Sequence, residues 1–146
     1  MCFTLRLHTS AAPPQGGLTQ ALGLMQSLQM EFVEIEGSVD PAQPLIYLWE
    51  IIDQDGEVCC RYVGKASRGA HRPRTQYRRN VNNILQGRPY RKSKPEEFRA
   101  IHRRMAEAVR CGHALRLSFI CNVMPAENIN LVERKWLHHY DLVQST

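Results

Sequence analysis

The stretch LIYLWEIIDQDGEVCCRYVG, residues 45–64, decides the fold. Its two halves, Leu45–Ile52 and Val58–Val63, are rich in β-branched and aromatic residues, which favour strands. Between them lies DQDG at residues 53–56, a sequence that favours a tight turn. The stretch therefore predicts a β-hairpin.

The hairpin places two tyrosines on one face of the sheet. If residues 54–55 form the loop, Tyr47 lies directly opposite Tyr62, and if residues 55–56 form it, the two are diagonal neighbours. Because side chains alternate between the faces of a strand, either register puts both phenols on the same face. Two phenols this close together can share one site.

Beyond the hairpin, the sequence predicts three helices and one more strand. A basic loop leads to a helix that begins at Pro73, a favoured first-turn residue, and ends before Gly87. After a basic connector at residues 88–94, Ser93 and Glu96 fit a capping box that starts a helix reaching residue 111. A strand is expected over 114–121 and an amphipathic helix over 126–143. This order predicts a mixed α/β (α+β) domain, with a three-stranded antiparallel sheet flanked by helices.

The first forty residues are predicted to form an extension packed on this core. A strand is expected over residues 1–8, a helix over Leu18–Met30 and a short strand over Glu31–Glu36. A linker with two prolines follows, at residues 37–44. We therefore divide the chain into an N-terminal extension, 1–40, and a core domain, 41–146.

The last predicted helix carries a carboxylate on its apolar face. Its stripe of Ile129, Val132, Trp136, Leu137, Tyr140 and Val143 encloses Glu133, although the polar face had room for it. A buried carboxylate is costly unless a cation or hydrogen-bond donors meet it. The sequence therefore predicts that an arginine or a metal ion faces Glu133.

Charge is sorted along the chain. Residues 1–60 hold one Arg against eight Asp or Glu, whereas residues 61–110 hold fifteen Lys or Arg against three Glu, a net charge of +12 in a chain whose total is +5. Such a segment indicates a polyanionic partner, nucleic acid first; the alternative is an ordinary soluble surface, which usually mixes both signs.

Composition narrows the class of protein. No apolar run is long enough to cross a membrane, and no signal peptide is recognised at the N-terminus. An odd number of cysteines without a zinc spacing favours reduced thiols in a cytoplasmic protein. These cysteines are Cys2, Cys59, Cys60, Cys111 and Cys121.

The motifs resemble those of the GIY-YIG nuclease family over about residues 44–141. LIY at 45–47 stands at the first motif, YVG at 62–64 at the second, and Lys65 follows directly, as in the repair-type members. Arg72 lies ten residues after Tyr62, which is the family's spacing for its arginine, and Glu133 on a late helix has the place of the metal ligand. The chain departs from the family at Leu45, which replaces the first glycine. At the fourteenth position after Tyr62, often Tyr or His, it has Gln76, with Tyr77 one residue further on.

The resemblance implies a metal-dependent endonuclease that hydrolyses DNA phosphodiester bonds. One divalent ion, Mg²⁺ or Mn²⁺, would be held by Glu133, Arg72 would bind the scissile phosphate, and a tyrosine would help to activate water. Nearby cations, Lys65 and Arg72, together with the metal, would favour the phenolate form of Tyr47, which makes it a candidate base. Tyr62 and Lys65 complete the candidate catalytic set.

Several assignments stay open at this point. Arg74 rivals Arg72 for the arginine's role, Tyr77 fits a catalytic or a core aromatic equally, and His71 fits a phosphate contact or an exposed loop. Alternative functions are a catalytically silent nucleic-acid-binding module of GIY-YIG fold and an RNA-directed nuclease. Further contacts to nucleic acid are expected from basic residues of the central segment, namely Arg68, Arg74, Arg78, Arg79, Arg88, Arg91 and Lys92.

Overall fold

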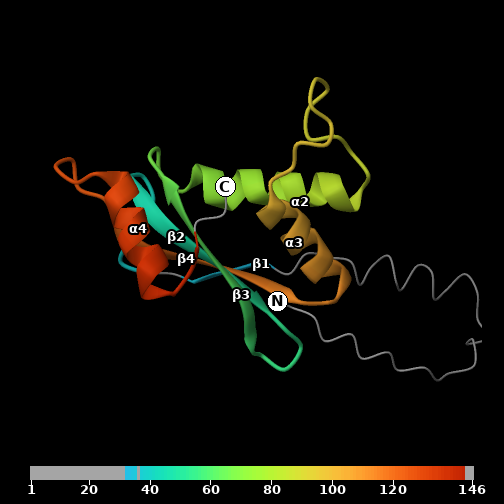
Figure 1. Cartoon of the computed structure of the whole chain (residues 1–146), viewed down its shortest axis with the longest axis horizontal. Coiled ribbons are helices and arrows are strands. Elements are labelled where there is room, and N and C mark those ends of the chain that lie inside the picture. The colour runs from blue at the N-terminus through green and yellow to red at the C-terminus, as the bar shows by residue number, and fades with distance from the viewer. Residues whose placement is uncertain (1–31, 36, 144–146) are drawn as a thin grey trace, which may run out of the picture.

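The computed structural model describes residues 32–35 and 37–143 of the chain. The strand predicted over 1–8 and the helix predicted over 18–30 lie outside these residues. The elements in chain order are β1 (Phe32–Ile35), β2 (Leu45–Ile52), β3 (Val58–Ala66), a π-helical segment η1 (Arg72–Gln76), α2 (Tyr77–Leu85), α3 (Ala100–Arg110), β4 (Ala114–Asn122) and α4 (Ile129–His139) (Figure 1).

The sheet has four strands in the order β1-β4-β2-β3, which corrects the predicted three-stranded antiparallel sheet. β2 runs antiparallel to both β3 and β4, as predicted, but β1 lies parallel to β4, with Phe32 opposite Leu115. The short strand predicted near Glu31–Glu36 is β1. The sequence did not indicate that β1 pairs with β4. Parallel strands are not joined by a tight turn, so no local sequence signal marks such a pair.

The hairpin forms in the second of the two expected registers. Tyr47 lies opposite Gly64 and Trp49 opposite Tyr62, so the two tyrosines are diagonal neighbours on one face. The Asp53 carboxylate closes the turn by accepting hydrogen bonds from the backbone N–H groups of Asp55 (2.9 Å) and Glu57 (3.0 Å). The predicted turn sequence thus acts as expected.

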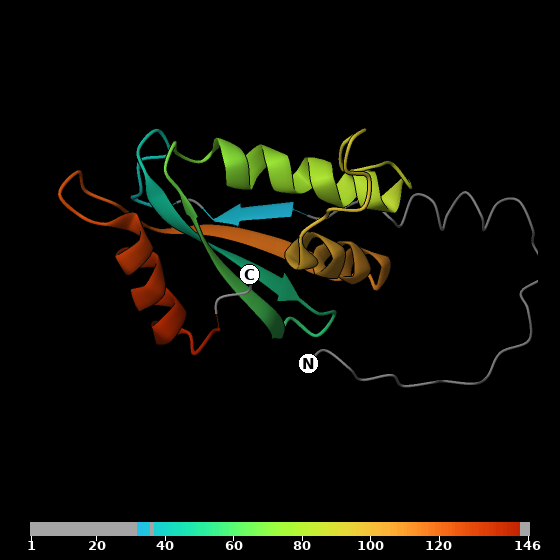
Figure 2. The ribbon, with the colours of Figure 1, turned by 45° about the horizontal axis from the view of Figure 1, so that its top comes forward.

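Helices cover both faces of the sheet, as Figure 2 shows: α2 and α3 lie on one face and α4 on the other. β2 is central and is buried on both sides, which explains its nearly continuous apolar sequence. Its odd-numbered residues, such as Tyr47 and Trp49, face α2 and α3. Its even-numbered residues Ile46 and Leu48 face α4.

The helix expected to start at the Ser93–Glu96 capping box starts instead at Ala100. Residues 88–99 fold back on themselves: the N–H of Tyr90 donates to the carbonyl of Pro95 (3.0 Å), and the Tyr90 and Phe98 rings meet at 5.5 Å. The helix begins only after Arg99, whose backbone is extended. As a result, Arg99 is the N-cap residue of α3 and not an internal residue of a longer helix.

The last helix is shorter than predicted. The Asn128 side chain caps α4 by accepting a hydrogen bond from the N–H of Asn130 (2.9 Å), and the chain leaves the helix after Tyr140 through Asp141, whose φ is 53°. Val143 is therefore not in the apolar stripe; it is 93% exposed. Glu133 is buried in the stripe, as predicted.

A tight turn anchors the basic loop that follows β3. Gly69 has φ +83°, a conformation that favours glycine, and a Cβ atom there would come within 2.5 Å of the Pro41 carbonyl oxygen. The neighbouring Ala70 N–H donates to the same oxygen (2.8 Å). The helical chain then begins at Arg72, one residue before the predicted start, with Pro73 buried in its first turn.

Candidate active-site cleft

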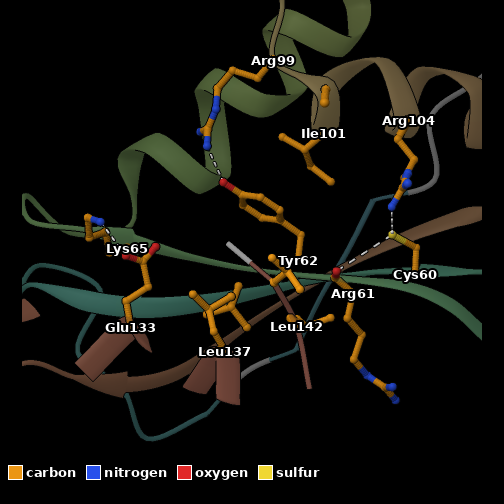
Figure 3. A pocket seen from close by; sticks show the side chains of 13 residues that line it. Cys60, Arg61, Tyr62, Lys65, Arg99, Ile101, Arg104, Glu133, Leu137 and Leu142 are labelled. Atoms are coloured by element: carbon orange, nitrogen blue, oxygen red, sulfur yellow. Dashed lines mark hydrogen bonds and ion pairs between the residues drawn. The ribbon is translucent and has the colours of Figure 1, made fainter. Parts of the chain in front are cut away.

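A cleft of about 300 Å³ opens at the free edge of β3, shown in Figure 3. It is lined by Tyr62 and Lys65 of β3, Arg99 before α3, and Glu133 and Leu137 of α4. β3 is one of the two outer strands of the sheet in the described part of the chain, so side chains from its two faces can meet around its edge. The cleft therefore joins residues that the sheet otherwise separates.

Glu133 is 7% exposed, and its partner is Lys65. The Lys65 ammonium nitrogen lies 2.5 Å from one carboxylate oxygen, and the Lys65 side chain is 36% exposed. The sequence predicted an arginine or a metal ion opposite Glu133, and the side chain that faces it is a lysine. The reason is the register: Lys65 shares the face of β3 that packs on α4 with Val63, and the arginine on that face, Arg61, is paired with Glu50 (3.1 Å).

Tyr62 presents its hydroxyl to the cleft. Nη2 of Arg99 donates a hydrogen bond to that hydroxyl, and the guanidinium also lies over the Tyr62 ring, 5.6 Å from its centroid (Figure 3). Nη1 of Arg99 donates to the hydroxyl of Tyr77 at 3.4 Å. One arginine therefore contacts both Tyr62 at the wall of the cleft and Tyr77 in the core behind it.

Arg99 is the residue that the sequence-based reasoning missed. It was placed inside a helix starting near residue 93, where its side chain had no defined direction. The signal that could have located it is the apolar period of α3, whose first buried members are Ile101 and Met105. A helix start near Ile101 would have put Arg99 at the end of the preceding loop.

Tyr47 lies behind the cleft and not in it. It is 1% exposed, and its hydroxyl shares a hydrogen bond of 2.7 Å with the Tyr77 hydroxyl. Burial raises the pKa of Tyr47 to about 12, and the hydrogen bond with Tyr77 and the charges of Arg72 and Arg99 offset this only in part. Among the described residues, desolvation of Tyr47 thus outweighs the charges of the neighbouring cations and opposes the phenolate form.

Tyr77 is a core residue as well. Burial raises the pKa of its phenol, and its ring packs against Trp49 and against His102. Burial also lowers the pKa of His102 to about 4, with further lowering by the charges of Arg99 and Arg72. His102 Nδ1 has no hydrogen-bond partner among the described residues. His102 is therefore neutral near pH 7, and its ring packs against Tyr77 in the core.

Gly64 is required by the position of Tyr47. The two residues face each other across β2 and β3, and a Cβ atom on Gly64 would overlap the Tyr47 ring, coming within 2.6 Å of its Cε2. The glycine of the YVG motif thus lets the ring lie across the neighbouring strand. This gives the motif a packing reason that is independent of any family.

Arg72 lines a second cavity of about 490 Å³ next to the cleft. Arg68 and His71 line it too, and Lys65 lines both cavities. Tyr62, Lys65 and Glu133 therefore share the cleft, while Arg72 reaches it only through Lys65. The candidate residues are thus divided between two cavities that meet at Lys65, with Tyr47 buried behind them.

Arg74 lies at the other side of the sheet. Its guanidinium makes three hydrogen bonds to the Glu34 carboxylate of β1 (2.6, 3.0 and 3.1 Å) and lies 5.1 Å from the centroid of the Phe119 ring. Because β1 and β3 are the two outer strands, this ion pair is far along the sheet from the cleft. The geometry favours Arg72 over Arg74 for a role at the cleft.

The other basic residues expected to contact nucleic acid occupy separate surfaces. Arg74, Arg78, Arg79 and Arg88 line a shallow groove of about 390 Å³ along α2. Arg91 stacks on Tyr90 at 5.0 Å in the 88–99 loop, next to exposed Lys92. Arg68 lies in the second cavity. Basic residues are thus present in the second cavity, along α2 and in the 88–99 loop.

A metal ion in the cleft would have one protein carboxylate to bind. Glu133 is the sole acid among the residues that line it, and the described part of the chain contains no group of three or more His, Cys, Asp or Glu side chains able to hold a metal. Such a donor set fits Mg²⁺, which commonly keeps several waters and takes further oxygens from a substrate phosphate. A metal would have to compete with Lys65 for the carboxylate.

No family model, no curated protein and no solved structure matches this chain. The similarity to GIY-YIG nucleases therefore rests on the motif residues quoted above. Within residues 32–35 and 37–143, no helix is both long enough and apolar enough to cross a bilayer. The cysteines of this part, Cys59, Cys60, Cys111 and Cys121, form no disulfide.

Proposed function

We propose that this protein is a metal-dependent endonuclease that hydrolyses phosphodiester bonds of DNA. The observation that carries the proposal is the cleft itself: a phenol (Tyr62), an ammonium (Lys65) and a buried carboxylate (Glu133) line one opening at the free edge of β3. Phosphodiester hydrolysis needs a group that activates water and positive charge on the reacting phosphate, and these residue types can supply both.

Each residue has a role that its position supports. Tyr62, whose hydroxyl faces the cleft, orients the attacking water in place of the buried Tyr47, and in its phenolate form it accepts the proton that this water loses as it attacks. Arg72 binds the phosphate from the adjoining cavity through its planar fork of donors. Lys65, which lines both cavities, bridges the two sites. When bound at Glu133, a divalent ion supplies positive charge to the leaving oxygen.

The charge distribution supports a nucleic-acid substrate. Fifteen Lys or Arg fall within residues 61–110, and most of them lie in the second cavity, the α2 groove or the 88–99 loop. Phosphate contacts of this kind hold nucleic acid irrespective of its sequence. DNA is the proposed substrate, and RNA of matched length is the comparison that tests this choice.

A second candidate function is a silent nucleic-acid-binding module, and one observation favours it. The Lys65–Glu133 ion pair, at 2.5 Å, gives the buried carboxylate a cation without any metal. Such a pair could be kept for folding alone. The two functions differ in a simple respect: the module binds DNA and never cleaves it.

Purified protein incubated with supercoiled plasmid tests the proposal. We expect nicked and then linear plasmid in the presence of Mg²⁺ or Mn²⁺, and intact plasmid when EDTA is present. Parallel incubations with a structured RNA and a single-stranded DNA define the substrate. Intact plasmid under all metal conditions, with DNA binding retained, would favour the silent module.

A further inference from the structure

The cations that line the cleft differ in their partners. Lys65 is paired with Glu133, and Arg61 is paired with Glu50 at 3.1 Å. Arg99 differs: no carboxylate of the described residues lies within ion-pair distance of its guanidinium. Its contacts are the hydroxyls of Tyr62 and Tyr77, which accept hydrogen bonds but carry no charge.

The location of Arg99 makes its charge costly. It directly precedes α3, where the backbone N–H groups of the first turn already create a positive end, and the structure gives this start no side-chain cap and no acidic residue. The Arg99 side chain is also partly buried, and its guanidinium lies over the Tyr62 ring. A cation placed there without a counter-ion suits an anion that arrives from outside.

The guanidinium also has donors to spare. It carries five N–H groups in a planar fork, of which the described contacts use two. Figure 3 shows its side chain directed from the start of α3 into the cleft toward the Tyr62 hydroxyl. An oxyanion beside Tyr62 would therefore meet a charged, oriented donor group.

We propose that Arg99 is a phosphate-binding residue of the cleft and holds a backbone phosphodiester of nucleic acid beside Tyr62. The choice of ligand rests on the proposed function, because nucleic acid supplies the phosphate. The Arg99 and Arg72 cavities meet at Lys65, so a strand crossing the edge of β3 places one phosphate in each. Arg99 is thereby a substrate-binding residue and not only a support for Tyr62.

Binding measured without catalysis tests this assignment. Fluorescence anisotropy with a labelled duplex oligonucleotide in EDTA compares wild type, Arg99→Met and Arg103→Met. Arg103 is the matched control: it lies on the same helix, and its guanidinium contacts Glu96. We expect Arg99→Met to weaken binding about tenfold or more and to reduce the salt slope by about one unit. The Arg103→Met variant should bind nearly as wild type does.

A second measurement on the wild-type protein is independent of how the variants fold. The Arg99 Nε–H signal in ¹⁵N NMR is followed during titration with dimethyl phosphate, a diester, and with inorganic phosphate. A shift of this signal by the diester supports the proposal. A shift with inorganic phosphate alone, together with unchanged oligonucleotide affinity in Arg99→Met, means an adventitious ion only and overturns it.

Failure of this inference is distinct from failure of the nuclease proposal. Equal affinities of wild type and a folded Arg99→Met variant, with plasmid cleavage intact, would remove Arg99 from the binding site and leave the nuclease standing. Loss of affinity in Arg99→Met in a protein that never cleaves plasmid would keep the phosphate site and identify a binding module. Arg99→Lys, which keeps the charge but loses the fork, should recover only part of the affinity.

Discussion

At the scale of single residues, burial distinguishes the tyrosine that can contact a substrate, Tyr62, from the one that cannot, Tyr47. Tyr47 and Tyr62 belong to the same motif pair and lie on the same face of the sheet. Tyr47 is enclosed by the core and has a pKa raised to about 12, whereas Tyr62 opens into the cleft. Sequence motifs cannot separate the two, because the difference arises from how α2 and α3 cover the sheet.

Phenylalanine substitutions separate the roles of the two tyrosines. Tyr62→Phe should lower the cleavage rate by about 100-fold or more, as expected for loss of a group that transfers protons, with little change in folding. Tyr47→Phe removes the buried hydrogen bond to Tyr77 and should lower the free energy of unfolding by about 1 kcal/mol. Single-turnover cleavage and urea unfolding measure the two effects. A Tyr62→Phe enzyme as fast as wild type would show that the phenol takes no part in the chemistry.

His102 predicts how stability depends on pH. Its pKa falls from 6.5 to about 4 in the folded protein, so below pH 6.5 the unfolded chain binds a proton that the folded chain does not. The contribution of neutral His102 to the free energy of unfolding is therefore fully present above pH 6.5 and is lost as the pH falls toward 4. Between about pH 7 and pH 5 the loss should be about 2 kcal/mol.

Urea unfolding at the two pH values checks the His102 prediction. His102→Gln should be markedly less sensitive to acid than wild type, while His138→Gln, a change at an exposed position on α4, should lose stability as wild type does. If His102→Gln and wild type lose the same free energy of unfolding between pH 7 and pH 5, a group other than His102 causes the loss of stability in acid.

At the scale of secondary-structure elements, β1 ties down one end of α2. Glu34 of β1 pairs with Arg74, and Phe32 lies under the Arg78 guanidinium at 4.5 Å. Arg74 is thereby engaged in holding a strand, while Arg72, two residues earlier, faces the second cavity. β1, which belongs to the predicted N-terminal extension, therefore distinguishes the two candidate arginines: it binds Arg74 and leaves Arg72 at the second cavity.

Arg72→Lys and Arg74→Gln should therefore behave differently. Arg72→Lys keeps the charge but loses the paired donors, so we expect DNA binding to persist and cleavage to fall by about 100-fold. Arg74→Gln breaks a largely exposed ion pair, so we expect a change in the free energy of unfolding of no more than about 1 kcal/mol and nearly normal cleavage. Cleavage and thermal melting of both variants decide the matter. Normal cleavage by Arg72→Lys together with impaired cleavage by Arg74→Gln would assign the phosphate-binding role to Arg74 and not to Arg72.

The predictability of the elements follows from how local their signals are. The β2–β3 hairpin, β4 and the helix after β3 were predicted because periodicity, turn residues and Pro73 act over a few positions. The parallel pairing of β1 with β4 and the late start of α3 were not. The first depends on residues some eighty positions apart, and the second accompanies a loop at residues 88–99 in which Tyr90 contacts Phe98.

The candidate site divides in the same way. The burial of Glu133 follows from the helical period of α4, and the shared face of Tyr47 and Tyr62 follows from strand alternation. The identity of Lys65 as the partner of Glu133, and the entry of Arg99 into the cleft, depend on how three elements meet at the edge of β3. No pattern in one segment carries that information.

At the scale of the whole molecule, charge predicts how binding responds to salt. The cations extend from the second cavity along α2 to the 88–99 loop. The logarithm of the DNA affinity should fall linearly with that of the salt concentration, with a slope near −0.9 per phosphate neutralised. Single replacement of Arg78, Arg79, Arg91 or Lys92 should flatten the slope by about one unit at most. Affinity that does not vary with salt would assign these cations another purpose.

The central claim is that the buried carboxylate serves chemistry and not folding alone. The most direct measurement compares Mg²⁺-dependent plasmid cleavage by wild type, Glu133→Gln and Glu57→Gln, an exposed control in the hairpin turn, with circular dichroism to verify folding. We predict that Glu133→Gln remains folded and binds DNA, but cleaves no plasmid, whereas Glu57→Gln cleaves as wild type does. Undiminished Mg²⁺-dependent cleavage by Glu133→Gln would contradict it.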